Sequence, residues 1–315
     1  MSISAGFHGT YGLPDRRDAA SHWLVERANQ MTSRYVVAVD GSRPAAAAVR
    51  WALERAKTDG VVLMLVHVLD DTADVDAAAD GERLLLDTAD QLSAAEPGLS
   101  IRTQLLTGSV PRALASFVGS DDMLVIGTGK TGFLHGRVLG SRSVQIAAIA
   151  PCTVAVIPDL DLRFRRGVVA GVDRHDTAGA IARAAGAEAK RRTEELLLVQ
   201  AEPSIGTRPT ASLSSELAIA EALARAREAF PDVVIRSRVA GRPPAEALLD
   251  GARDKALLVL GPGSLDPARS PIGSVLHDVL LNANSPVLIS RATEDRLGDA
   301  AVPVAVSRGS GRAGR

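Results

Sequence analysis

Residues 127–141 contain the pattern in this chain that points most directly to chemistry. They read Gly-Thr-Gly-Lys-Thr-Gly-Phe-Leu-His-Gly-Arg-Val-Leu-Gly-Ser and follow a short apolar run. Glycine permits positive φ, so Gly127 and Gly129 allow consecutive backbone N–H groups to converge on one anion. Gly140 and Ser141 then begin a predicted helix, whose unpaired N–H groups and dipole favour a phosphate. The segment therefore predicts a loop that binds the phosphates of a nucleotide.

A carboxylate ends the first apolar run of the chain. Residues 35–40 read Tyr-Val-Val-Ala-Val-Asp. Open parallel sheets bind ligands at the carboxyl ends of central strands, and the strand that ends at Asp40 should lie beside the strand before Gly127. Asp40 is then placed to accept hydrogen bonds from an adenine amino group or a ribose hydroxyl. The alternative is that Asp40 only orders the turn that follows it.

The spacing excludes a Walker-type loop. The tripeptide Gly129-Lys130-Thr131 resembles the end of the G-x-x-x-x-G-K-[ST] motif, but the first glycine of that motif would fall at Leu124, inside a predicted strand. No general base, nucleophile or metal-ligand set accompanies the loop, so we expect a binding protein and not an enzyme. His67 and His277 are expected to pack or to lie at the surface.

The composition limits the class of protein. The net charge of −1 argues against a general binder of nucleic acids or membrane surfaces. Hydrophobic residues make up 46% of the chain but aromatic residues only 3%, a bias that is typical of buried parallel strands. The single cysteine, Cys152, excludes an intramolecular disulfide. The chain shows neither a signal-peptide pattern nor an apolar run near the roughly 20 residues of a membrane helix, so we expect a cytoplasmic protein.

The two halves of the chain repeat one pattern at an offset of 133 or 134 residues. The matching segments, in order, are 35–40 with 168–173, 63–68 with 196–201, 108–114 with 241–248, 123–127 with 257–261, 140–141 with 273–274, and 150–154 with 284–288. Six matches in one order indicate an internal duplication.

Each half alternates short apolar runs with amphipathic stretches, which predicts βαβ units and a parallel sheet. The predicted strands are 35–39, 61–68, 100–106, 122–126 and 153–157, then 167–172, 195–200, 233–239, 256–260 and 286–290. The predicted helices are 42–60, 80–95, 111–118 and one from 140, then 177–191, 213–229, 243–253 and 273–282. We therefore predict domains at 34–158 and 167–291, a charged linker at 159–166, and flexible tails at 1–33 and 292–315.

These residues resemble the universal stress protein family, with two of its domains in tandem. Many members of that family bind ATP through G-x-x-G, nine further residues and G-[ST]. Here Gly127 supplies the first glycine and nine residues separate position 130 from Gly140-Ser141, with Lys130 in place of the second glycine. Val-Asp-Gly-Ser at 39–42 and Pro-Cys-Thr-Val at 151–154 also match the family.

The resemblance implies two tandem flavodoxin-like (Rossmann-like) α/β domains, each a five-stranded parallel sheet flanked by helices. It also implies a site for ATP or another adenine nucleotide in the first half, with adenine between Asp40 and Val68. No ligand set for Mg²⁺ is visible. Lys130 would either block a glycine-only conformation or reach the phosphates. The implied cofactor-binding residues are Asp40, Gly41, Val68, Gly127, Thr128, Gly129, Lys130, Gly140, Ser141 and Arg142.

The corresponding loop of the second half, residues 261–274, is predicted to be degenerate. It is one residue shorter between its anchor glycines, and Pro262, Pro267 and Pro271 each remove a backbone N–H donor. Asp266 adds a negative charge where a phosphate would lie. We therefore expect one nucleotide for each chain.

The implied function is that of an ATP-binding stress-response regulator with an unknown protein partner. The alternatives are an interaction module that needs no nucleotide and a slow ATPase. The last strand of each half should lie at a sheet edge, where exposed backbone groups invite pairing. The resemblance implies that two such domains join through these strands, and covalent linkage raises the effective concentration of the second half. We therefore expect an intrachain pseudo-dimer, with a homodimer as a further option.

Overall fold

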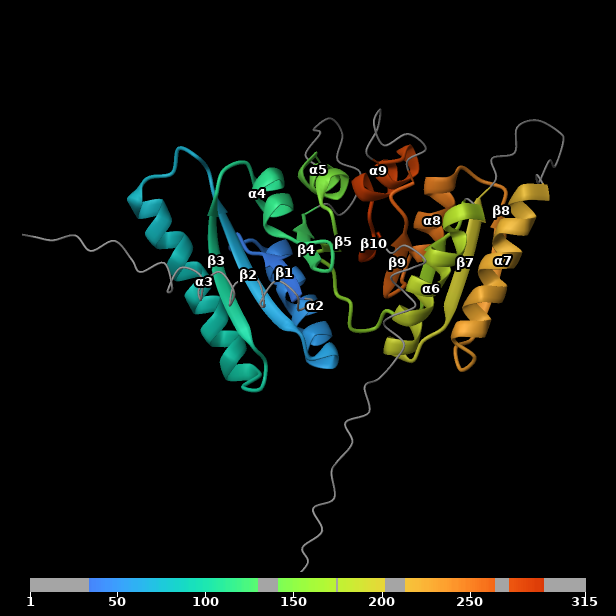
Figure 1. Ribbon diagram of the computed structural model, residues 1–315, viewed down its shortest axis with the longest axis horizontal. Helices are drawn as coiled ribbons and strands as arrows, with labels where there is room; N and C mark the ends of the chain where they lie inside the picture. Colours follow the sequence, from blue (N-terminus) through green and yellow to red (C-terminus); the bar gives the residue numbers. More distant parts are fainter. Residues whose placement is uncertain (1–33, 130–140, 174, 202–212, 264–271, 292–315) are drawn as a thin grey trace, which may run out of the picture. The chain divides into compact units, whose positions relative to one another are not determined.

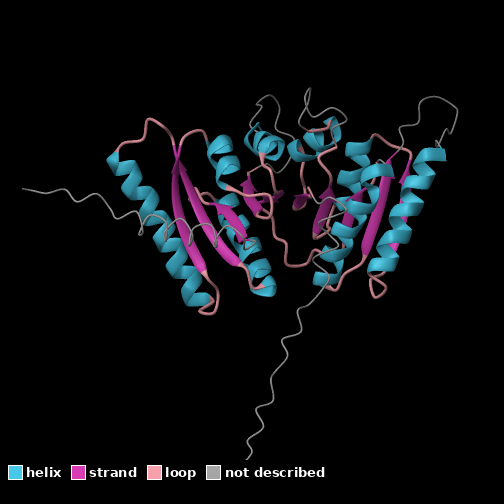
Figure 2. Ribbon diagram, viewed as in Figure 1, coloured by secondary structure: helices cyan, strands magenta, loops and turns pink. Residues whose placement is uncertain are grey.

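The computed structural model describes residues 34–129, 141–173, 175–201, 213–263 and 272–291 (Figure 1). Both predicted tails, most of the first phosphate loop and most of its counterpart in the second half lie outside these residues. Helices and strands alternate along the described chain, as Figure 2 shows, which confirms the predicted α/β class.

The first half contains strands and helices in strict alternation. They are β1 (Arg34–Ala38), α2 (Arg43–Asp59), β2 (Val62–Leu69), α3 (Val75–Ala95), β3 (Ile101–Thr107), α4 (Val110–Phe117), β4 (Met123–Thr128), α5 (Ser141–Ile149) and β5 (Thr153–Pro158). The second half repeats the order with β6 (Val168–Gly171), α6 (His175–Arg192), β7 (Leu196–Ala201), α7 (Leu213–Ala229), β8 (Ile235–Ala240), α8 (Pro244–Ala252), β9 (Leu257–Leu260), α9 (Ser274–Leu281) and β10 (Val287–Ile289).

The described strands form a ten-stranded sheet in the order β3-β2-β1-β4-β5-β10-β9-β6-β7-β8. Within each half all pairs are parallel, and the order is that of the first five strands of a Rossmann sheet, in which the chain returns after the third strand to the other side of the first. This reversal of the winding direction leaves a gap between the connections that follow β1 and β4. In open sheets of this kind, ligands bind at that position.

The last strands of the two halves join the sheet into one. β5 and β10 pair antiparallel, with Ala155 opposite Leu288 and Val156 opposite Val287. The sequence-based prediction that these two strands lie together is therefore confirmed.

Helix α2 begins and ends at the predicted capping residues. The Ser42 hydroxyl accepts a hydrogen bond from the Ala45 N–H at 3.3 Å, and Pro44 lies in the first turn, where its missing N–H costs nothing. Gly60 ends the helix at φ 65°, and its N–H bonds to Ala56 O. These caps fix where α2 starts relative to the end of β1.

Helix α3 begins earlier than the sequence predicts, at Val75 instead of residue 80. The carboxylate of Asp74 accepts the Ala77 N–H at 2.9 Å and so caps the additional turn. Val75 is 83% exposed, so this turn carries none of the apolar periodicity by which a helix is recognised in a sequence. Strand β8 differs in the opposite direction: it begins at Ile235, two residues later than predicted.

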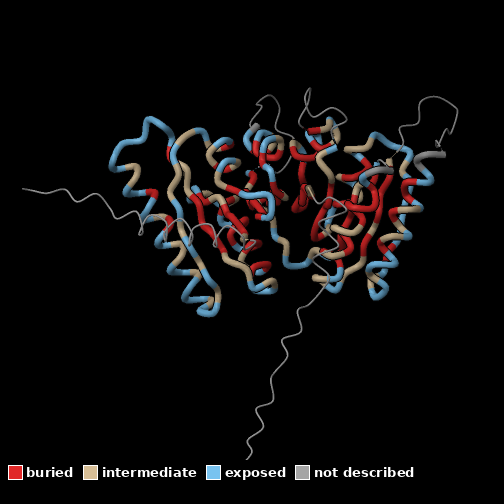
Figure 3. The backbone as a smooth tube through the Cα atoms, viewed as in Figure 1, coloured by how far each residue is buried: buried red, intermediate tan, exposed pale blue. Residues whose placement is uncertain are grey.

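Helices cover both faces of the sheet, and the buried residues lie between them and the strands, as Figure 3 shows. The first core cluster joins the strands to α2, α3, α6 and α7, and the second joins them to α4, α5, α8 and α9. The largest fully buried side chains are aliphatic, among them Leu63, Leu124 and Leu257, as the composition predicts. No helix in the described part of the chain is long and apolar enough to cross a membrane.

Candidate functional site

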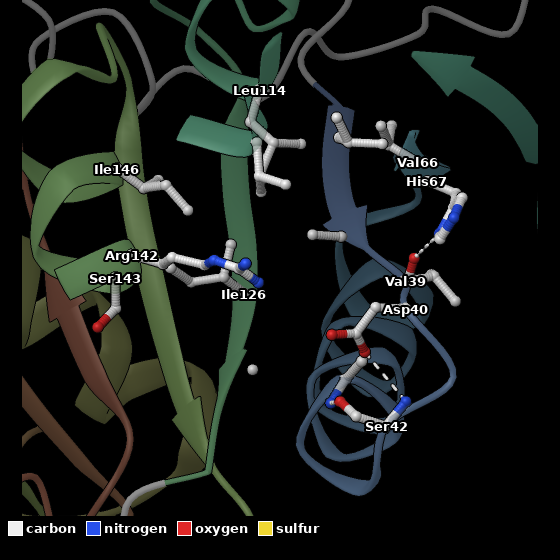
Figure 4. A pocket seen from close by; sticks show the side chains of 15 residues that line it. Val39, Asp40, Ser42, Val66, His67, Leu114, Ile126, Arg142, Ser143 and Ile146 are labelled. Carbon is white, nitrogen blue, oxygen red and sulfur yellow. Dashed lines mark hydrogen bonds between the residues drawn. The ribbon is translucent and has the colours of Figure 1, made fainter. Parts of the chain in front are cut away.

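A pocket opens at the carboxyl ends of β1 and β4, where the direction of winding reverses (Figure 4). Its polar lining residues are Asp40, Ser42, His67, Arg142 and Ser143, and the others are Ala38, Val39, Ala45, Val66, Val68, Val110, Leu114, Ile126, Gly127 and Ile146. The pocket lies between α4 and α5 and adjoins the predicted phosphate loop, because Gly127 is the last pocket residue of β4.

The wall of the pocket is apolar and rigid. Leu114 of α4, Ile126 of β4 and Ile146 of α5 are each at most 4% exposed and belong to the second core cluster. These side chains close the base of the pocket. The apolar surface left open to a ligand comes from the half-buried Ala38, Val68 and Val110, against which a flat aromatic ring can pack. The polar residues of the lining surround this apolar surface and could orient the ring or a charged group attached to it.

Asp40 is exposed and takes part in the turn after β1. Its Oδ1 accepts the Ser42 N–H at 3.0 Å, which is the turn-ordering role that the sequence left as an alternative. Its Oδ2 makes no hydrogen bond within the described residues and can accept one from a ligand. Both roles are therefore compatible with the same side-chain position.

The glycines of the site act differently from the prediction. Gly41 has φ 75°, but neither Gly127 nor Gly129 lies in the positive-φ region. A Cβ atom on Gly127 would overlap the carbonyl group of Pro44, so glycine is required there for the close approach of β4 to the first turn of α2. The expectation that Gly127 and Gly129 supply positive φ is therefore wrong.

Arg142 brings a cation to the pocket. It is exposed on the first turn of α5, and Figure 4 shows it extending from that helix toward Ile126. A guanidinium beside a helix N-terminus suits a phosphate, because both the charge and the unpaired N–H groups favour an anion. Ser143, one residue further on, is 7% exposed and also lines the pocket.

His67 is held by the protein itself. Its Nδ1 lies 2.6 Å from Val39 O, and the ring packs beneath α3, where a Cβ on Gly81 would stand 2.8 Å from its Cδ2. The packing role expected for His67 therefore agrees with its contacts, although the residue borders the pocket.

The structure brings together only part of the predicted set. Asp40, Val68, Gly127 and Arg142 line the pocket. Gly41 in the turn after β1, Thr128 at the end of β4 and Gly129 directly after it do not. Lys130 and Gly140 lie outside the described residues, as does the side chain of Ser141, the first residue of α5. Sequence analysis missed Leu114, Ser143 and Ile146. The spacing of positions 143 and 146 after the helix start at 141 is the signal that would have placed the last two on one face.

The second half differs at the corresponding place. Gly171 occupies the position of Ala38, and a Cβ there would stand 2.6 Å from Leu260 Cδ2 and 2.9 Å from Leu248 Cδ2. At the start of α9, the N–H of Gly273 donates to Pro262 O at 2.9 Å. Leu248 and Leu260, the counterparts of Leu114 and Ile126, thus close in on Gly171 where the first half has the Ala38 side chain. The N–H of Gly273 is also already used as a donor. Among the described residues, no group of three or more His, Cys, Asp or Glu side chains could hold a metal ion.

Known proteins of the same architecture are similar to this chain over most of its length. The model of the universal stress protein family matches residues 31–158 and 165–291. Universal stress protein Rv2005c of Mycobacterium tuberculosis is 28% identical over 283 residues, which cover 81% of this chain and 96% of that protein.

Two solved structures are also similar to this chain, and the first of them is similar in fold over most of its length. A universal stress protein from Archaeoglobus fulgidus superposes with a TM-score of 0.65 at 17% identity and covers 83% of this chain and 97% of its own. A universal stress protein from Archaeoglobus fulgidus in complex with dAMP is 26% identical, covers 40% of this chain and 98% of its own, and has a TM-score of 0.34. Because the family model matches both halves, the chain belongs to the universal stress protein family and carries two of its domains in tandem.

Proposed function

We propose that the first half binds one adenine nucleotide, ATP in the working state, and that the chain acts as a nucleotide-dependent stress-response regulator and not as an enzyme. The observation that carries the proposal is the pocket at the carboxyl ends of β1 and β4, with an apolar wall on one side and Asp40, Ser42 and Arg142 around it. This combination matches a nucleotide, which has a flat apolar base at one end and negative charge at the other.

The base is proposed to lie against Ala38, Val68 and Val110, the half-buried apolar residues of the pocket lining. Asp40 Oδ2 then accepts a hydrogen bond from the ribose or the base, while its Oδ1 keeps the turn bond to Ser42. The phosphates point toward α5, where Arg142 and the first N–H groups of the helix provide positive potential. The second half is proposed to take no nucleotide, because Leu248 and Leu260 close in on Gly171 and the N–H of Gly273 is already bonded to Pro262 O.

A titration with a variant that fills the pocket tests the proposal. Ala38 lines the pocket at the end of β1 and is only half-buried. Ala38→Leu introduces there the kind of side chain that lies beside Gly171 in the second half. The matched control is Ala201→Leu, which adds the same atoms at the half-buried end of β7 in the second half.

Calorimetry with ATP is expected to give one site for each chain, at least tenfold weaker binding in Ala38→Leu and unchanged binding in Ala201→Leu. Two equivalent sites, or no binding at millimolar ATP, would contradict the proposal. An interaction module that needs no nucleotide would show no binding at all. A slow ATPase would release inorganic phosphate from bound ATP, which we expect not to occur.

A further inference from the structure

Two buried side chains meet across the boundary between the two halves. Arg55 of α2 and Glu188 of α6 are 8% and 3% exposed, and the guanidinium contacts the carboxylate through two bonds, Nη1–Oε2 at 2.6 Å and Nη2–Oε1 at 2.5 Å. The fork-to-fork geometry is that of a strong charge-assisted pair. Burial alone would lower the pKa of Arg55, but the bonds and charge of Glu188 raise it above its ordinary value.

These two residues are equivalent positions of the duplicated domain. They lie 133 residues apart, which is the offset that relates Tyr35 of β1 to Val168 of β6. Ala155 and Leu288, which face each other where β5 meets β10, are separated by the same offset. In a two-fold arrangement, a residue on the axis faces its own copy. Both pairs therefore lie on the pseudo-two-fold axis that relates the halves.

The charges on this axis differ between the halves. If two first halves met in the same way, Arg55 would face a second Arg55, and two second halves would place Glu188 against Glu188. A buried charge that loses its oppositely charged partner strongly destabilises the arrangement that contains it. A second pair, off the axis, also favours unlike halves. Arg191 pairs with Asp59 of the first half, and the counterpart of Asp59 in the second half is Arg192. Two second halves would therefore place Arg191 against another arginine.

We propose that the Arg55–Glu188 pair determines which surfaces join: the β5–α2 face of the first half accepts the second half of this chain and excludes another first half. The hydrophobic contacts of β5 and β10 distinguish like from unlike halves less sharply: Val156 opposite Val287 fits either arrangement, and only Ala155 opposite Leu288 joins side chains of different size. The axial pair supplies the difference in free energy on which such a choice depends. This proposal is independent of nucleotide binding.

A single cysteine on the axis reports which halves have met. In the full chain with Cys152→Ser, Ala155→Cys places a thiol opposite Leu288 when unlike halves pair, and opposite the same introduced thiol of a second chain when two first halves pair. Only the second arrangement gives a disulfide between chains, since paired strand residues lie within disulfide distance. Ala155→Cys with Leu288→Cys is the positive control and should form an intrachain disulfide.

The chain is unfolded, refolded at high protein concentration under oxidising conditions, and analysed by non-reducing electrophoresis. With Arg55 and Glu188 in place, we expect almost no covalent dimer. With Arg55→Met and Glu188→Met together, we expect at least a fivefold rise in covalent dimer, because the penalty on like pairing is removed. The control Arg83→Met removes an exposed ion pair with Asp80 and should leave the dimer fraction unchanged.

The proposal is overturned if the Met–Met variant gives no more covalent dimer than the chain that keeps Arg55 and Glu188. It is also overturned if the chain that keeps both residues already gives abundant covalent dimer. A stability measurement guards against a variant that only unfolds. Glu188→Met alone leaves Arg55 with only the Tyr35 hydroxyl at 3.2 Å and Asp59 at 3.9 Å, and should have a lower midpoint of denaturation than the Met–Met variant. The reverse order would show that the two side chains do not depend on each other.

Discussion

Arg142 is the pocket residue whose role can be separated most cleanly from the fold, because it is exposed and makes no hydrogen bond within the described residues. Arg142→Ala should weaken ATP about tenfold, the usual value of a charge-assisted hydrogen bond, and should weaken adenosine little. Competition titrations of ATP and adenosine measure the difference. Arg50→Ala, on the exposed side of α2, is the matched control and should change neither affinity. Equal losses for both ligands would move the phosphates away from α5.

Cys152 shows how burial controls a reactive group. Its side chain is fully buried at the start of β5, and burial raises the pKa of the thiol to about 11. A thiol-specific reagent at pH 8 should therefore react with the folded protein far more slowly than with the protein in denaturant, where the pKa is about 8.5. Rapid reaction of the folded chain would contradict the buried position.

The same shift has a consequence for stability. The unfolded state loses the thiol proton first, so this contribution to the free energy of unfolding is present below about pH 8.5 and is lost as the pH rises toward 11. Denaturation midpoints of the unaltered chain and of Cys152→Ser, compared between about pH 8 and about pH 10, measure it. The unaltered chain should lose more stability over this interval than the variant.

At the scale of elements, the first turn of α3 depends on one side chain. Asp74 caps the Ala77 N–H at 2.9 Å, and Asp74→Ala should lower the free energy of unfolding by about 1 kcal/mol. Asp74→Asn keeps an equally good cap and should stay near the stability of the unaltered protein. Denaturant titration measures both. If the two variants lose the same amount, the charge of Asp74 matters and the cap does not.

At the scale of the whole molecule, the β5–β10 pairing holds the halves together. Val156 lies opposite Val287, is fully buried and belongs to the second core cluster. Val156→Glu should therefore lower the denaturation midpoint strongly or cause aggregation, because a buried carboxylate without a partner costs several kcal/mol. Val239→Glu, at an exposed position of β8, should have little effect and serves as the control. A stable, monomeric Val156→Glu protein would mean that the halves do not need this pairing.

Sequence alone determined the repeat, the α/β class, the caps of α2 and the pairing of the last strands. The first three features depend on local patterns: apolar runs of strand length, helix capping residues such as Ser42 and Gly60, and a nearly constant offset between like segments. The pairing of the last strands was predicted from the family resemblance and from their places at the sheet edges. The start of α3 escaped this kind of analysis, because its first turn is polar and exposed, and only the contact of Asp74 with Ala77 defines it.

Only the tertiary structure decided how the site is built. It showed that Gly127 is required by the nearness of Pro44 and not by positive φ, and that Leu114 and Ile146 form the pocket wall. It also set Arg55 against Glu188. Each of these contacts joins residues far apart in the chain, and no pattern of neighbouring residues specifies which distant side chain will lie opposite. The close approach of β4 to α2, and of α2 to α6, follows from how sheet and helices pack, and that packing exists only in the folded chain.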